Sequence, residues 1–143
     1  MDLINAPSKN RILVVEDDRD VASVICLALE DFYDVALAEN VAEAIRTLHA
    51  TPFDLVLLDW RLGHHCGQEV LNELERLHSA ARPQVVITSG GEDADLLDAI
   101  DAGKVRLITK PFGIEDLVRT VTLILSGTRR ASAESDHRGN SVP

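Results

Sequence analysis

Short apolar runs alternate with amphipathic segments along most of the chain, and this alternation constrains the fold more than any other feature. The runs are rich in Val, Ile and Leu, which is typical of β-strands. They predict strands at residues 12–15, 34–38, 53–58, 84–88 and 105–109. Apolar residues at helical spacing predict helices within residues 18–31, 40–52, 70–77, 92–102 and 114–125.

The third run contains four consecutive apolar residues, Leu55 to Leu58, and so predicts a strand covered on both faces. Five strands that each precede a helix predict an α/β fold, a doubly wound parallel sheet with right-handed crossovers. This domain is expected at residues 11–125, after an N-terminal extension at 1–10. Apolar residues become rare from Ser126, so residues 126–143 are expected to form a disordered tail.

Charge and cysteine content narrow the function classes. The formal net charge of −10 and the pI of about 4.8 argue against direct binding of nucleic acid or of an anionic membrane. Cys26 and Cys66 form no CxxC pair and no disulfide framework, as expected in a reducing compartment. No segment resembles a signal peptide or approaches the roughly 20 apolar residues of a membrane span. A cytoplasmic protein is therefore expected.

Acidic and hydroxyl side chains, together with one lysine, stand at the carboxyl ends of the predicted strands. In an open parallel α/β sheet these ends form one edge, where ligands bind. Carboxylates gathered there repel one another and favour a hard divalent cation such as Mg²⁺. A carboxylate nucleophile, a metal, a lysine and a hydroxyl together suffice to form an aspartyl phosphate. The residues at this edge are Glu16, Asp17, Asp18, Asp59, Thr88, Ser89 and Lys110.

A structural alternative exists for some of these acids. Asp17 or Asp18 could simply cap the helix that follows the first strand. Helix capping could account for one or two of these acids. It does not account for acidic, hydroxyl and lysine side chains at the ends of four different strands.

These motifs resemble the receiver domain of bacterial response regulators over about residues 11–125. The segments that carry the resemblance are Ile12-Leu13-Val14-Val15-Glu16-Asp17-Asp18, Asp54-Leu55-Val56-Leu57-Leu58-Asp59, Ile87-Thr88-Ser89-Gly90, Ala102-Gly103 and Lys110-Pro111-Phe112. The resemblance implies a flavodoxin-like fold of five strand–helix units with strand order 2-1-3-4-5.

The resemblance also implies a cofactor, Mg²⁺. Position by position, its ligands would be Glu16, Asp17, Asp59 and the backbone carbonyl of Arg61, directly or through water.

For the phosphoryl group, the resemblance implies Asp59 as the acceptor. Lys110 would pair with the acceptor and then with a phosphoryl oxygen, and the Lys110–Pro111 bond is expected to be cis. Thr88 is assigned as the switch hydroxyl that binds and reports the phosphoryl group. An alignment shifted by one residue would assign Ser89 instead.

The chain departs from the family pattern at several positions. Gly63 stands where proline is usual, four residues after the acceptor, so a looser loop is expected over residues 63–67. Leu107 occupies the position of the usual aromatic switch residue, so a rotating aromatic cannot be the readout there. Trp60, Gly63 and His64 are expected to modulate the access of water to the phosphoryl group.

His64, His65 and Cys66 carry donor atoms that zinc accepts. Their spacing matches no common zinc site and no second ligand pair is evident. We therefore expect these side chains to line the surface of the loop.

The resemblance implies a stand-alone, single-domain response regulator, phosphorylated by a sensor histidine kinase or a histidine phosphotransfer protein. Output is expected through contact with a downstream protein, as an effector, a relay or a phosphate sink, and a homodimer stays open. Such a protein is not an enzyme beyond supporting its own phosphorylation and dephosphorylation.

Other functions fit less well. A cobalamin-binding module would need histidine, and an aspartyl-phosphate phosphatase a second acid, where Arg61 stands. A flavin or dinucleotide domain would need a glycine-rich first loop in place of Glu16 to Arg19. The remaining alternative is a pseudo-receiver that binds proteins without phosphate.

Overall fold

The computed structural model describes residues 9–77, 82–90, 96 and 105–139, with side chains as far as residue 127. Its main element is a five-stranded parallel sheet in the order β2-β1-β3-β6-β7. Counted along this sheet alone, the order is the predicted 2-1-3-4-5. The strands are β1 (Arg11–Val15), β2 (Asp34–Ala38), β3 (Leu55–Asp59), β6 (Gln84–Ser89) and β7 (Val105–Thr109).

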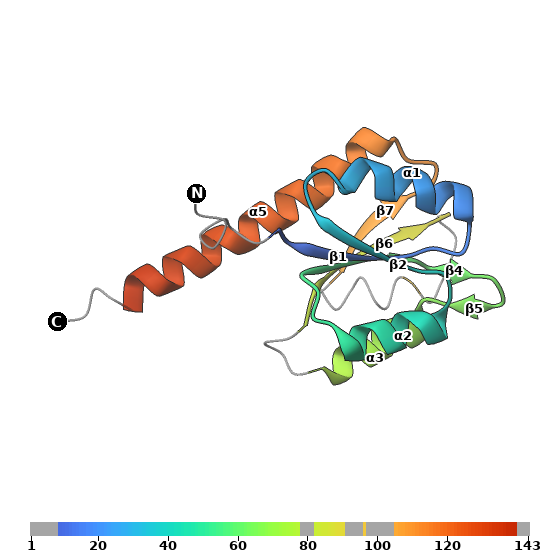
Figure 1. The fold of residues 1–143 in the computed structure, drawn as a ribbon, viewed down its shortest axis with the longest axis horizontal. Coiled ribbons are helices and arrows are strands. Elements are labelled where there is room, and N and C mark those ends of the chain that lie inside the picture. The colour runs from blue at the N-terminus through green and yellow to red at the C-terminus, as the bar shows by residue number, and fades with distance from the viewer. Residues whose placement is uncertain (1–8, 78–81, 91–95, 97–104, 140–143) are drawn as a thin grey trace, which may run out of the picture.

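Helices cover both faces of the sheet, as predicted (Figure 1). On one face lie α1 (Arg19–Leu29) and α5 (Ile114–Gly139), and on the other lie α2 (Val41–Ala50) and α3 (Gln68–Arg76). The helix expected over 92–102 lies outside the described residues except for Leu96, which is helical and buried.

The core is split by the sheet into two clusters. Strand residues alternate between them, because successive side chains of a strand point to opposite faces. Val14, Leu57 and Val86 pack with α1 and α5, whereas Val15, Leu58 and Ile87 pack with α2 and α3. Every residue of β3 is buried, so the run Leu55 to Leu58 is covered on both faces as expected.

Polar side chains cap the first two helices. The Asp18 carboxylate accepts the backbone N–H groups of Asp20 and Val21 at the start of α1. The Asn40 side chain accepts the N–H of Glu43 at 2.8 Å at the start of α2. Asp18 is therefore a helix cap, the structural role anticipated for one of the two aspartates.

Helix α5 is longer than the sequence pattern predicted. Helix α5 does not end at Leu125 but continues to Gly139, and Figure 1 shows it running beyond the sheet. Low apolar content argued for disorder, but the segment has no proline before Gly139 and contains Ala, Arg and Glu, which favour helix. It also extends a helix that is already anchored, so nucleation adds no cost.

The expected loop over residues 63–67 is also corrected. The structure instead forms a small antiparallel ribbon, β4 (Arg61–Leu62) and β5 (His65–Cys66), with Arg61 paired to Cys66 and Leu62 to His65. Gly63 has φ +63° at the first position of its two-residue turn. That conformation suits a tight hairpin, so glycine here supports a defined turn and not a loose one.

Candidate functional site

Strand alternation brings four of the predicted residues to one place. Asp59 ends β3 and Thr88 lies beside it in β6, as register partners in the parallel sheet. Glu16 and Lys110 directly follow β1 and β7. The residue two positions before each of these four packs on the face of the sheet that α1 and α5 cover; these residues are Val14, Leu57, Val86 and Ile108. Because strand side chains two positions apart point to the same face, the four site residues lie on that face too, at the carboxyl edge.

Three carboxylates form the centre of the site. Glu16, Asp17 and Asp59 each offer an oxygen within 4.8 Å of the others. Glu16 and Asp59 are buried, being 3% and 6% exposed, whereas Asp17 is exposed. The Lys110 ammonium nitrogen lies 3.3 Å from Asp59 Oδ1 and 3.9 Å from Glu16 Oε1. The lysine therefore supplies positive charge directly at the predicted acceptor.

The surroundings of Glu16 change the pKa of its carboxyl group. Burial, a hydrogen bond with Asp59 and the charges of Asp59 and Asp17 raise the pKa of Glu16 to about 8, although the Lys110 charge opposes this. The metal-free site therefore favours a protonated Glu16 at neutral pH. A bound divalent cation would have to displace that proton.

We expect the stability of the metal-free protein to fall as pH rises from about 5 to 8. The folded protein keeps the Glu16 proton in this range, while the unfolded chain releases it near the ordinary glutamate pKa of 4.5, so rising pH favours unfolding. The free energy of unfolding, measured with denaturant at the two ends of this pH range and with chelator present, tests this expectation. The Glu16→Gln variant, which has no such proton, should show a smaller fall, and an equal fall in both proteins would contradict the assignment.

The donor set fits a hard cation. Carboxylate oxygens are the ligands that Mg²⁺ prefers, and at most a few of them are used, with water completing the octahedron. The Arg61 N–H donates to Asp59 Oδ1 at 3.3 Å, so its residue lies beside the acceptor, while the metal role of its carbonyl stays a prediction. Asp18 does not belong to this set, because its carboxylate caps α1.

The geometry favours Thr88 over Ser89 as the hydroxyl that faces the acceptor. Both side chains are buried. Thr88 is the register partner of Asp59, and Ser89, as the next residue in the strand, points to the opposite face of the sheet. The backbone of Ser89 serves the site in another way, because its carbonyl accepts the Lys110 N–H at 2.7 Å. The Lys110–Pro111 bond is cis, as predicted.

The residues that follow Asp59 in the sequence differ in whether they are buried or exposed. Trp60 is 1% exposed and packs in the core with α2 and α3, so it does not line the path of water to Asp59. This corrects its predicted role, and the cause is strand alternation, which turns residue 60 away from residue 59. Gly63 and His64 form the exposed turn of the ribbon.

No sequence signal pointed to the contact that this turn makes with the acidic cluster. The Gly63 N–H donates to Asp17 Oδ2 at 2.9 Å. Of the other loop donors, His65 lies 3.5 Å from Glu69, and Cys66 is half-buried. Within the described residues, Glu16, Asp17 and Asp59 are the group arranged for a metal, and the His64-His65-Cys66 segment is not part of it.

Leu107 lies in β7 and is 39% exposed. An aliphatic side chain therefore stands at the surface where the resemblance places an aromatic switch. Its effect on signalling stays a prediction.

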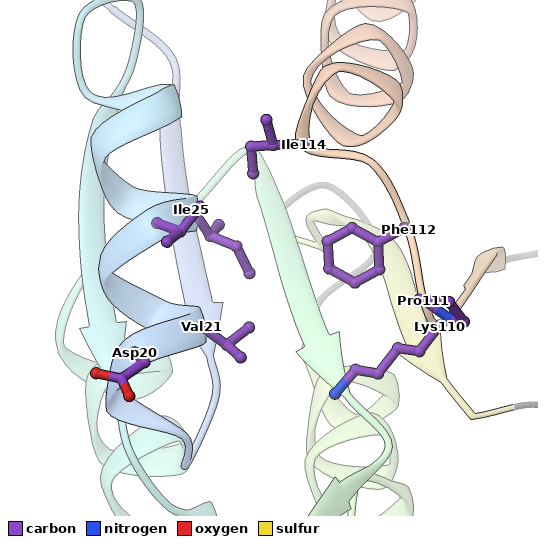
Figure 2. A pocket seen from close by; sticks show the side chains of 8 residues that line it. Asp20, Val21, Ile25, Lys110, Pro111, Phe112 and Ile114 are labelled. Carbon is purple, nitrogen blue, oxygen red and sulfur yellow. The ribbon is translucent and has the colours of Figure 1, made fainter.

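An apolar groove of about 610 Å³ adjoins the site (Figure 2). One side is lined by residues of α1, namely Asp20, Val21, Val24 and Ile25, and the other by Lys110, Pro111, Phe112 and Ile114. Val24 is 54% exposed, so this groove presents an aliphatic side chain to solvent. In the part of the chain that the structure describes, no helix is long and apolar enough to cross a membrane.

Comparisons with known proteins agree with this geometry. The family model of the response regulator receiver domain matches residues 12–122. The phosphate regulon transcriptional regulatory protein PhoB of Escherichia coli is 34% identical over 118 residues, which cover 80% of this chain and 51% of PhoB. YkoG of Bacillus subtilis, an uncharacterized transcriptional regulatory protein, is 34% identical over 85% of this chain and 54% of its own length. The chain thus spans about half the length of the curated relatives it matches.

Solved structures give the same result. The signal receiver domain of a response regulator from Bermanella marisrubri has a TM-score of 0.73 and 28% identity, covering 82% of this chain and 99% of that one. The receiver domain of the sensor histidine kinase PA1611 from Pseudomonas aeruginosa has a TM-score of 0.68 and 25% identity, covering 79% and 94%. The latter is described with a magnesium ion coordinated in the active-site cleft. The fold, the acidic edge and these matches together show that this chain belongs to the response regulator receiver domain family.

Proposed function

We propose that this receiver takes a phosphoryl group onto Asp59 from the phosphohistidine of a sensor histidine kinase or a histidine phosphotransfer protein, with Mg²⁺ as cofactor. One observation carries the proposal. The Lys110 nitrogen lies 3.3 Å from Asp59 Oδ1, within a cluster of three carboxylates that can hold a cation. A nucleophile, a fixed positive charge and a metal-binding set are thus joined in one site.

Each residue of the site has its own role in the phosphoryl transfer. An Asp59 carboxylate oxygen attacks phosphorus, the P–O bond forms and the P–N bond to the donor histidine breaks. The electron pair of that bond goes to the imidazole nitrogen, which takes up a proton from solvent, so that neutral imidazole leaves. Lys110 and Thr88 can each hold a phosphoryl oxygen. When bound, Mg²⁺ neutralises charge that gathers on the phosphoryl oxygens.

The same chemistry limits what the protein does. The phosphoryl group ends on the protein's own Asp59 and leaves by hydrolysis or by return to a histidine. We therefore propose that the receiver is not an enzyme acting on separate substrates.

For output, we propose contact with a downstream protein, as an effector, a relay or a phosphate sink. The net charge of −10 supports a protein partner over direct binding of nucleic acid. PhoB and YkoG are named transcriptional regulatory proteins and are about twice as long as the matched segment. The stand-alone organisation and the homodimer stay predictions.

Incubation with acetyl phosphate, followed by measurement of the intact mass, tests the proposal. We expect a gain of one phosphoryl group when Mg²⁺ is present and no gain in excess chelator, because the carboxylate cluster otherwise repels the phosphate. A gain that is equal in chelator would contradict the proposed role of Mg²⁺. If neither acetyl phosphate nor a panel of phosphorylated kinases yields a gain, the pseudo-receiver alternative becomes the better account.

The groove beside Lys110 gives this proposal a second test. The donor histidine must reach Asp59, so the donor protein has to contact the surface around it, and apolar Val24 lies on that surface. We expect Val24→Asp to slow phosphotransfer from a phosphorylated kinase by about tenfold. The same variant should react with acetyl phosphate at the parent rate, because that donor needs no protein contact.

Leu123→Asp is the matched control. Leu123 is 66% exposed but lies on α5 and does not line the groove. It should leave both reactions unchanged. Equal slowing by the two variants would show that the effect comes from added charge and not from the groove.

A further inference from the structure

The contact between Gly63 and Asp17 joins parts of the acidic site that are far apart in the sequence. The Gly63 N–H donates to Asp17 Oδ2 at 2.9 Å. A hydrogen bond to a carboxylate is stronger than one to a neutral oxygen. Asp17 is exposed, so this bond restricts a side chain that solvent would otherwise leave free to turn.

The donor is held by a defined piece of structure. Leu62 is 4% exposed and fixes β4 in the core, and the Gly67 N–H donates to the Trp60 carbonyl at 2.6 Å, which closes the base of the ribbon. A Cβ on Gly67 would lie 3.1 Å from the Asp59 carbonyl oxygen, so the ribbon packs directly against the acceptor strand. The Gly63 N–H is therefore fixed relative to Asp59 by the packing of the ribbon.

We propose that Gly63 is a positioning residue for the Mg²⁺ site. Its N–H holds the Asp17 carboxylate where it can act together with Glu16 and Asp59, before any cation arrives. This inference rests on the proposed function, because it concerns the Mg²⁺ of the same site. Ordering a ligand in advance raises affinity, because the cost of fixing it is met on folding and not on binding.

The identity of residue 63 makes this contact available. The resemblance leads one to expect proline at this position, and proline has no N–H to donate. Gly63 therefore gives this chain a link from the ribbon to Asp17 that a proline could not provide. The turn also requires the positive φ of +63° at residue 63, which proline cannot adopt. The test therefore has to distinguish the loss of the N–H from the disruption of the turn.

A set of variants makes that distinction. Gly63→Pro removes the N–H. Gly63→Asn keeps it, and asparagine tolerates the left-handed conformation. An added Cβ meets no atom closer than Asp17 Oδ2 at 4.0 Å, so the cost of asparagine here is backbone strain at φ +63° and not a clash. Each change is made in the parent protein and in Asp17→Ala, and the Mg²⁺ dissociation constant is measured by calorimetry.

In the parent background we expect Gly63→Pro to weaken Mg²⁺ binding by about tenfold, the effect of one charge-assisted hydrogen bond. Gly63→Asn should lose less affinity than Gly63→Pro, because it bears the strain of a side chain at this φ but keeps the N–H. In the Asp17→Ala background, Gly63→Pro should change the affinity by less than about twofold, because its target is already gone. An equal loss in both backgrounds would mean that proline merely disrupts the turn, and would overturn the inference.

Hydrogen exchange of the Gly63 amide gives a readout that needs no metal. In metal-free protein we expect Asp17→Ala to speed this exchange by about tenfold, because the carboxylate acceptor is removed. Asp31→Ala, which removes another exposed acid, is the control. Unchanged exchange in Asp17→Ala would overturn the inference.

The outcomes separate the inference from the proposed function. If the parent protein binds no Mg²⁺, both are overturned. If the parent binds Mg²⁺ and Gly63→Pro binds it equally well, the proposed function stands and the positioning role of Gly63 is wrong.

Discussion

Asp59→Asn is expected to abolish phosphorylation completely in the presence of Mg²⁺ and acetyl phosphate. Asparagine has nearly the shape of aspartate, but its amide is not a nucleophile for phosphorus. Burial, a hydrogen bond with Asp59 and the charge of Asp59 raise the pKa of Glu16, and the change removes that charge. The metal-free variant should therefore unfold at a higher denaturant concentration than the parent at neutral pH. Intact mass and denaturant unfolding, measured on the same preparation, check both results.

Asp54→Asn is the matched control for this variant. Asp54 lies just before β3, at the end of the strand opposite to Asp59, and its carboxylate accepts the Arg11 N–H at 2.8 Å. An asparagine oxygen can accept the same bond, so this variant should gain the phosphoryl group normally. If Asp59→Asn still gained a full phosphoryl group, Asp59 would not be the acceptor.

Lys110→Ala is expected to slow phosphorylation by acetyl phosphate by about 10²–10³-fold, the usual effect of losing one preorganised charge in an active site. The ammonium group lies 3.3 Å from Asp59 Oδ1, near the position that a transferred phosphoryl group would occupy. Mg²⁺ affinity should not fall with this variant, because removing the lysine leaves the carboxylates more negative. Single-turnover rates and Mg²⁺ titration together separate a loss of chemistry from a loss of metal.

Lys9→Ala controls for net charge. Lys9 is exposed and lies before β1, at the start of the described chain, so the rate should stay at the parent value. A Lys110→Ala rate within about twofold of the parent would contradict the role given to Lys110.

The sequence was sufficient to predict the sheet and most of the site, for physical reasons. Runs such as Leu55 to Leu58 are typical of strands covered on both faces in a parallel sheet, and parallel strands bring their carboxyl ends to one edge. This placed Asp59 and Lys110 together although they lie far apart in the chain. The choice between Thr88 and Ser89 needed the register of β6, because a shift of one residue exchanges the faces.

Other features depended on packing that the sequence pattern does not reveal. Trp60 follows the acceptor in the sequence, but strand alternation turns it into the core. The ribbon of β4 and β5 is too short for a periodicity signal, and its bond to Asp17 comes from a backbone N–H, which every residue except proline carries. Helix α5 extends to Gly139 because an anchored helix continues through polar residues that would not form a helix alone.

The most direct test of the central claim is to locate the phosphoryl group on the chain. The parent protein is phosphorylated with Mg²⁺ and acetyl phosphate, and then reduced with borohydride, which converts an acyl phosphate to an alcohol. Peptide mass analysis should find this change at Asp59, in the fraction of molecules that gained a phosphoryl mass. A phosphoryl group on Ser89, on His64 or on another carboxylate would contradict the account, even if the intact mass had risen as predicted.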